Sequence, residues 1–164
     1  MIYQKNYFIE EPKATIIIVH GIAEHGGRYE HVAKFLNYNN YDVITYDQLG
    51  HGKSSGKRGK IKSFHEHIDS LHKVVLHDKQ RNNNEIFLLG HSMGGLVVNL
   101  YQVKYGNVAG IISVAAATNT PSNMKIFKYI GFPLSLWLSN ILSFVTVLIF
   151  LNIDSSILFP IFGT

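Results

Sequence analysis

The sequence predicts an α/β fold with a mostly parallel sheet and helices on both faces. Its apolar runs of strand length are continuous rather than alternating, which is typical of strands covered on both sides. Amphipathic helical patterns separate these runs, and strand–helix–strand repeats of this kind form right-handed crossovers. The expected strands carry β-branched residues and lie at residues 15–19, 41–46, 85–89 and 109–117.

The remaining elements follow from helical spacing and from position in the chain. Residues 3–9 are expected to add an antiparallel strand at the edge of the sheet. Helical patterns with one apolar face span residues 29–38, 64–75 and 93–105, and Gly106 is the expected stop of the last one. Each helix therefore follows a strand and can pack back onto the sheet.

Composition supports one domain with a buried core. The chain has 164 residues, of which 46% are apolar and 16% are charged. It has no cysteine, which excludes disulfides and thiolate metal sites and fits a reducing compartment. The first eleven residues contain no apolar stretch of the kind found in a secretory signal, so a cytoplasmic location is expected.

The formal net charge is +4, and basic residues gather in one segment, residues 53–62. Glycine and serine separate the cations there, and no aromatic residue lies among them. This composition indicates a solvated loop and no nucleic-acid partner. Attraction to an anionic lipid surface fits the segment better.

A pentapeptide at residues 90–94 has the pattern Gly-x-Ser-x-Gly and directly follows the apolar run Ile86–Leu89. Such a placement predicts a nucleophile elbow, in which a buried strand turns sharply at Ser92 and a helix opens at Gly94 and Gly95. Glycine is needed beside the serine because a Cβ there would collide with neighbouring backbone. Ser92 is therefore the candidate nucleophile.

A second motif, residues 20–23 with the sequence His-Gly-Ile-Ala, closes the first buried strand. A His-Gly turn at the carboxyl end of a strand can aim a backbone N–H into the crevice where an oxyanion forms. The alternative is an ordinary strand–helix turn. The elbow in the same chain favours the oxyanion interpretation.

Two other patterns suggest sites and fail on closer inspection. Residues 52–54, Gly-Lys-Ser, would complete a phosphate loop only if residue 47 were glycine, and it is aspartate. Asp47 is instead expected to cap N–H groups in a turn. The histidines between residues 65 and 77 resemble metal ligands, but the adjacent apolar stripe should leave them in solvent, so no metal is expected.

Residues 20–29, 47–54 and 90–95 together resemble the monoacylglycerol lipase and lysophospholipase group of α/β-hydrolases. The resemblance runs in order and spacing from about residue 12 to about residue 118. It implies that Ser92 attacks a lipid ester to form an acyl-enzyme, which water then hydrolyses, without a cofactor. It also implies an oxyanion hole formed by the backbone N–H groups of Ile22 and Met93. The residues that support these motifs are His20, Gly21, Gly90, His91, Gly94 and Gly95.

The sequence departs from this family after the elbow. The family follows the serine with an aspartate and then a histidine on loops after later strands, with a lipid-binding cap inserted between the serine and these residues. Here Asp154 is the only acid after Ser92, and no histidine follows His91. We therefore expect the core at residues 1–118 and the start of the cap at 119–164, with the fold truncated after its sixth strand and catalysis impaired. Asp154 lies where the cap begins and is assigned no role in the triad.

None of the histidines near the crevice matches the position of the family's base; these are His20, His25, His51 and His91. A base supplied by a partner polypeptide is one alternative. Another is a non-catalytic, membrane-associated remnant in which the elbow is only scaffolding. The strand at 111–117 is expected to lack its parallel neighbours and to expose an apolar edge.

Residues 129–153 form an uncharged segment of 25 residues, and a bilayer span needs roughly twenty. Pro133, Asn140 and serines at every fourth position give it a polar face. We therefore favour a cap helix with peripheral membrane contact over a transmembrane helix. The sequence indicates no oligomeric state.

Overall fold

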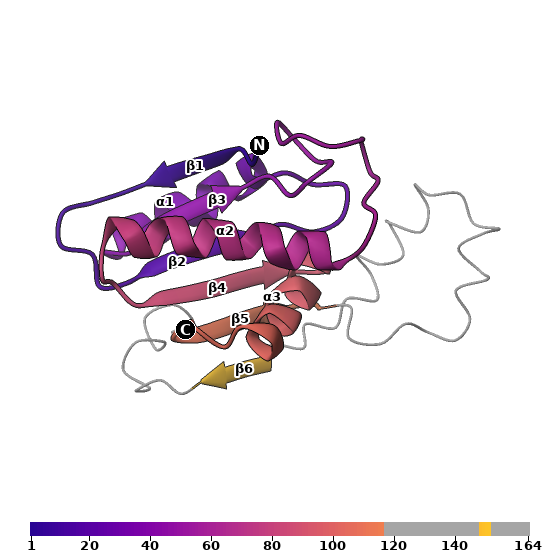
Figure 1. Ribbon diagram of the computed structural model, residues 1–164. Coiled ribbons are helices and arrows are strands. Elements are labelled where there is room, and N and C mark those ends of the chain that lie inside the picture. Colours follow the sequence, from indigo (N-terminus) through magenta and orange to yellow (C-terminus); the bar gives the residue numbers. More distant parts are fainter. Residues whose placement is uncertain (117–147, 152–164) are drawn as a thin grey trace.

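The computed structural model describes residues 1–116 and 148–151, and these form one six-stranded sheet in the order β1-β3-β2-β4-β5-β6 (Figure 1). The strands β2, β3, β4 and β5 pair in parallel, as the continuous apolar runs predicted. The strand bounds are Gln4–Tyr7 for β1, Thr15–Val19 for β2, Asp42–Tyr46 for β3, Ile86–His91 for β4, Gly110–Val114 for β5 and Leu148–Leu151 for β6.

The edge strand predicted near the N-terminus is present. β1 pairs antiparallel with β3, and Lys5 lies opposite Thr45 in the register. In the centre of the sheet Ile17 of β2 lies between Ile44 of β3 and Leu88 of β4. Every residue of β2 and β3 is buried.

Three α-helices connect the strands: α1 (Glu30–Tyr38), α2 (His65–Arg81) and α3 (Met93–Lys104). A short 3-10 helix, η1 (Gly26–Tyr29), leads into α1. The predicted spans of the first and third helices are confirmed to within a residue, and α2 extends six residues beyond the apolar stripe that predicted it, to Arg81.

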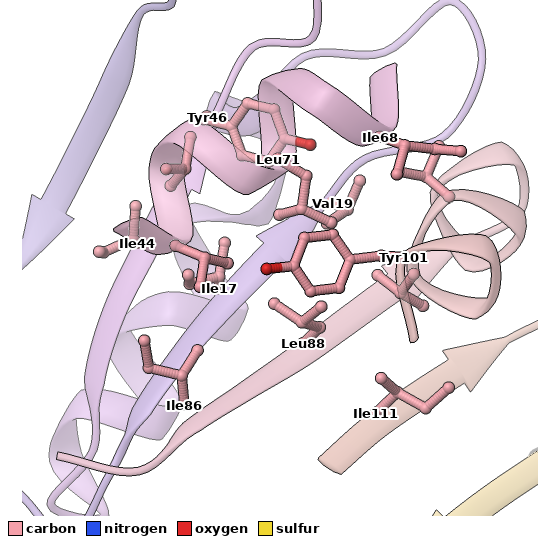
Figure 2. Close-up of a cluster of buried hydrophobic side chains, with 14 residues drawn as sticks. Ile17, Val19, Ile44, Tyr46, Ile68, Leu71, Ile86, Leu88, Tyr101 and Ile111 are labelled. Atoms are coloured by element: carbon pink, nitrogen blue, oxygen red, sulfur yellow. The ribbon is translucent and has the colours of Figure 1, made fainter. Parts of the chain in front are cut away.

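Successive residues of a buried strand point to opposite faces of the sheet, and both faces here carry helices. On one face α2 and α3 cover the strands, and Figure 2 shows Leu71 of α2 and Tyr101 of α3 packed with Ile17 and Leu88. On the other face Leu36 of α1 belongs to a second buried cluster that includes Ile16 and Ile18 of β2 and Val43 of β3. The sheet is therefore sandwiched between helices, as predicted.

The expectations for the end of the chain need correction where the structure describes it. Residues 148–151, which lie inside the segment predicted as a cap helix, form the strand β6. This strand pairs antiparallel with β5, Ser113 lying opposite Leu148, so the edge of β5 that we expected to be exposed is paired. A strand edge presents unpaired N–H and C=O groups, and an apolar run with a β-branched residue is suited to covering them.

The rest of the predicted cap segment, including Asp154, lies outside the described residues. Peripheral membrane contact through that region stays a prediction. None of the helices among residues 1–116 combines the length and the apolarity that a membrane span requires.

Candidate active site

Ser92 lies at the turn between β4 and α3, where the elbow was predicted. Its backbone has φ 53° and ψ −115°, a conformation that is costly for a residue with a Cβ. Two hydrogen bonds hold the turn: Ser92 N–H donates to the Val114 carbonyl (2.9 Å) and Leu96 N–H donates to the Ser92 carbonyl (3.2 Å). Strain of this kind persists only where surrounding structure enforces it, and here β5 and α3 do so.

The glycines around Ser92 are required by close backbone approach. A Cβ at Gly90 would collide with the carbonyl oxygen of Gly94. A Cβ at Gly94 would collide with the carbonyl oxygen of Val19, because α3 begins directly against the end of β2. The elbow therefore needs these glycines to bring α3 close to the sheet.

The structure brings the His-Gly turn and the elbow together. A Cβ at Gly21 would lie 3.4 Å from Ser92 Cβ and 3.3 Å from His91 Nδ1. Ile22, the next residue, and Met93, the residue after Ser92, both line a cavity of about 630 Å³. These are the two residues whose N–H groups were predicted to form the oxyanion hole.

Within the described residues, the backbone N–H groups of Ile22 and Met93 are available to donate hydrogen bonds to a ligand. Met93 is the first residue of α3, and the first N–H groups of a helix have no partner within it. Among residues 1–116 no hydrogen bond from the N–H of Ile22 or Met93 is formed. The positive end of the helix dipole at Met93 also favours negative charge there.

A polar network that the sequence analysis did not assign ties the two motifs together. The Glu24 carboxylate accepts a hydrogen bond from Gly21 N–H (2.9 Å), and Tyr29 Oη donates to the same Oε2 (2.7 Å). Tyr29 Oη also lies 2.9 Å from His91 Nδ1. The network thus connects the residue before Ile22 with the residue before Ser92.

Charge states in this network follow from its hydrogen bonds. Burial raises the pKa of Glu24, but hydrogen bonds from Tyr29 and Gly21 outweigh it and hold the pKa below its usual range. Burial and the neighbouring carboxylate raise the pKa of Tyr29. Glu24 is therefore an anion and Tyr29 keeps its proton. The Tyr29 hydroxyl has one hydrogen, which it donates to Glu24. The contact with His91 therefore requires that His91 Nδ1 carries a hydrogen and donates it to Tyr29 Oη.

One sequence signal could have identified Glu24. It follows Gly21 by three residues, the spacing at which a carboxylate reaches back to a backbone N–H in a turn. The contact between Tyr29 and His91 had no such signal, because the two are 62 residues apart in the chain.

His20 is fully buried and structural. Gln48 N–H donates to its Nε2 (2.9 Å), so the ring hydrogen lies on Nδ1, which donates to the Gly21 carbonyl (2.7 Å). Burial lowers the pKa of His20 to about 4. With both ring nitrogens occupied, His20 cannot accept the Ser92 proton; it ties the end of β2 to the loop after β3.

The expectation that the histidines of α2 face solvent is wrong for His67, which is 1% exposed. Its ring lies against Phe64 and His51, with centroid distances of 5.6 and 6.1 Å. Burial, and to a lesser extent His51, lowers the pKa of His67. The loop between β3 and α2 supplies His51 and covers this first turn of the helix, which the apolar stripe could not reveal. No group of three or more potential metal ligands occurs among the described residues.

Asp47 has the turn-capping role predicted for it. Its Oδ1 accepts a hydrogen bond from Gly26 N–H and its Oδ2 accepts one from Lys53 N–H, each 2.7 Å long. The Ser54 hydroxyl donates to the Asp47 carbonyl. Asp47 is therefore buried and satisfied, and it shapes the loop that borders the cavity.

The arrangement contains a nucleophile and two candidate oxyanion donors at the edge of one cavity. No side chain among residues 1–116 forms a hydrogen bond with Ser92 Oγ, so the described part of the chain supplies no base for it. The chemistry that this geometry suits is attack by Ser92 on a carbonyl whose oxygen would sit between Ile22 and Met93.

Comparison with known proteins agrees with this chemistry. The family model described as serine aminopeptidase, S33 (Hydrolase_4) matches residues 10–155. Human monoglyceride lipase is 36% identical over 123 residues, which are 73% of this chain and 41% of that protein. Phospholipase YtpA of Bacillus subtilis is 39% identical over 106 residues, 63% of this chain and 40% of that protein.

Among solved structures, the fold is similar to that of a monoacylglycerol lipase. The crystal structure of Paleococcus ferrophilus monoacylglycerol lipase matches with a TM-score of 0.64 and 31% identity, over 79% of this chain and 52% of that chain. The chain spans less than half the length of the two curated relatives.

Proposed function

Because this chain belongs to the serine aminopeptidase S33 family, within the monoacylglycerol lipase and lysophospholipase group of α/β-hydrolases, we propose that Ser92 is the nucleophile of a lipid ester hydrolase. The observation that carries the proposal is the strained backbone of Ser92 beside Met93 and Ile22, which line one cavity. The proposed substrates are monoacylglycerols or lysophospholipids.

The proposed reaction follows from the position of each group. Ser92 Oγ adds to the ester carbonyl carbon, and the carbonyl oxygen becomes an oxyanion that accepts hydrogen bonds from the N–H groups of Ile22 and Met93. Collapse of this intermediate breaks the ester C–O bond, the proton that leaves Ser92 Oγ ends on the departing oxygen, and the alcohol is released with an acyl group left on Ser92. Water then hydrolyses the acyl-enzyme to a fatty acid.

Support for a lipid substrate comes from the cavity and from the relatives. Ile22, Ile61 and Met93 give the cavity an apolar part suited to an acyl chain, and the similar proteins are named as lipases of monoglycerides or as a phospholipase. Transfer of these substrates to the present chain is part of the proposal.

We also propose that the 164-residue chain turns over slowly by itself. No histidine follows His91 in the sequence, and His20 is held neutral with both nitrogens occupied. In a Ser-His-Asp hydrolase, loss of the base costs on the order of a million-fold in kcat.

A pair of assays tests the two statements separately. A fluorophosphonate probe at high concentration should label wild-type protein slowly at Ser92 and leave Ser92→Ala unlabelled, because the oxyanion donors and the elbow favour attack on phosphorus even though no base activates the serine. Absence of labelling in a folded wild-type chain would indicate the non-catalytic scaffold instead. Hydrolysis of p-nitrophenyl butyrate at ordinary enzyme rates, abolished in Ser92→Ala, would refute the proposed impairment.

A further inference from the structure

The loop between β3 and α2 concentrates positive charge on one exposed surface. We call residues 53–62 the basic loop; its cations, all exposed, are Lys53, Lys57, Arg58, Lys60 and Lys62. These five charges exceed the net charge of +4 of the whole chain, so the rest of the chain is close to neutral. The positive field of the protein is therefore localised to this loop.

The basic loop has a defined backbone. Gly59 N–H donates to the Gly50 carbonyl (3.1 Å), Gly50 N–H to the Ser55 carbonyl (3.0 Å) and Lys60 N–H to the Lys57 carbonyl (3.0 Å). Ser55 N–H donates to the Met1 carbonyl (3.0 Å), which ties the loop to the N-terminus. The cations are thus presented by a folded surface rather than by an extended tail.

The charges of this surface are unpaired within the described residues. None of the cations of the basic loop forms an ion pair there. Lys53 Nζ lies 4.8 Å from the centroid of the Tyr3 ring. Two flanking acids contact the backbone of the loop rather than its cationic groups: Asp47 accepts the Lys53 N–H, and Glu66 accepts the Lys62 N–H at 3.2 Å.

The basic loop also borders the cavity beside Ser92. Arg58 and Ile61 line that cavity together with Ile22, which is 51% exposed, and Met93. Figure 1 shows this loop at the end of the sheet toward which β3 and β4 point, where the elbow also lies. One cation of the loop, Arg58, therefore lines the cavity beside the apolar side chains of Ile22 and Ile61, with Glu24 also in the lining.

We propose that the basic loop binds the anionic surface of a lipid bilayer and holds the opening of the cavity against it. Lysine and arginine near such a surface each strengthen binding about fivefold, and the neighbouring Ile22 and Ile61 can contact the apolar boundary. A nucleic acid fits less well because no aromatic side chain lies within residues 53–62 to stack on bases. The proposal does not require Ser92 to be reactive.

Binding of the full chain to lipid vesicles, measured for wild type and for two variants with matched charge, tests the proposed role of the basic loop. The loop variant is K57Q/R58Q/K60Q, which keeps Lys53 on Tyr3. The control variant is K34Q/K73Q/K79Q, which removes the same charge from exposed lysines of α1 and α2. Both are measured by co-sedimentation with vesicles of phosphatidylcholine alone and with phosphatidylglycerol added, at low and high salt, after circular dichroism has shown them folded.

The expected result is binding that needs phosphatidylglycerol, weakens with salt and falls about a hundredfold in the loop variant, while the control variant stays within about threefold of wild type. The proposal would be overturned if both variants lost the same affinity for vesicles or if the wild-type chain did not bind. Binding to phosphatidylcholine alone that is unchanged by salt and by the loop substitutions would also overturn it. So would tight binding of the basic loop to a DNA or RNA oligonucleotide without vesicle binding. Fluorophosphonate labelling of Ser92 in the same samples shows separately whether the hydrolase proposal stands.

Discussion

The Tyr29 hydroxyl donates a 2.7 Å hydrogen bond to Glu24 Oε2, and through that carboxylate it supports the turn that presents Ile22. The same hydroxyl lies 2.9 Å from His91 Nδ1 on the elbow. One phenol thus connects the two chain segments whose N–H groups were predicted to share an oxyanion. The network positions these segments, and its carboxylate, Glu24, also lines the cavity.

Removal of the Tyr29 hydroxyl should loosen this connection. We expect Tyr29→Phe to lower the free energy of unfolding by about 2 kcal/mol, since a buried bond to a charged group is lost and its partner is left unsatisfied. Urea denaturation measures the change. Fluorophosphonate labelling of Ser92 should slow at least severalfold in the same variant, because the Gly21 turn is less well held.

The matched control is Tyr38→Phe. Tyr38 is 88% exposed at the end of α1, so loss of its hydroxyl should change the unfolding free energy by less than about 0.5 kcal/mol. If the two substitutions changed the free energy of unfolding equally, the hydrogen bonds of Tyr29 would not stabilise the protein more than an exposed hydroxyl does.

The strained backbone of Ser92 predicts an unusual order of stability among variants. Glycine adopts positive φ readily, whereas alanine keeps the Cβ that makes φ 53° costly. Ser92→Gly should therefore be more stable than Ser92→Ala by about 1 kcal/mol in urea denaturation. If alanine proves as stable as glycine at this position, the elbow stores no strain.

Acidification should destabilise the protein through His20. Its pKa is lowered from 6.5 in the unfolded chain to about 4 in the folded protein, so between these values the unfolded state binds the extra proton. The stability from burying neutral His20 is present above pH 6.5 and is lost as the pH falls toward 4. The shift corresponds to about 3 kcal/mol.

Two measurements check this effect. The urea midpoint should fall continuously between pH 6.5 and pH 4. The NMR spectrum at pH 5.5 should show the His20 ring neutral with hydrogen on Nδ1, as the bond from Gln48 N–H to Nε2 requires. An imidazolium signal for His20 at that pH would contradict the structural assignment.

The parallel sheet, its helices and the elbow could be predicted from residue patterns along the chain. Continuous apolar runs report burial on both faces, and the Gly-x-Ser-x-Gly pattern reports a backbone geometry that few other residues tolerate. The turn-capping role of Asp47 was also readable, because aspartate at the end of a strand serves nearby N–H groups. These are local properties, and local patterns encode them.

The contacts between distant segments could not be predicted in this way and became visible in the folded protein. The Tyr29–His91 pair, the burial of His67 under the loop after β3, and the fixed tautomer of His20 each depend on chain segments brought together by the sheet. The pairing of β6 with β5 is of the same kind: residues 148–151 form a strand within a segment whose apolar composition predicted a helix. Sequence periodicity reflects contacts between residues a few positions apart. A strand edge or a buried hydrogen-bond acceptor pairs with whichever group the fold places beside it, and that group can be far away in the sequence.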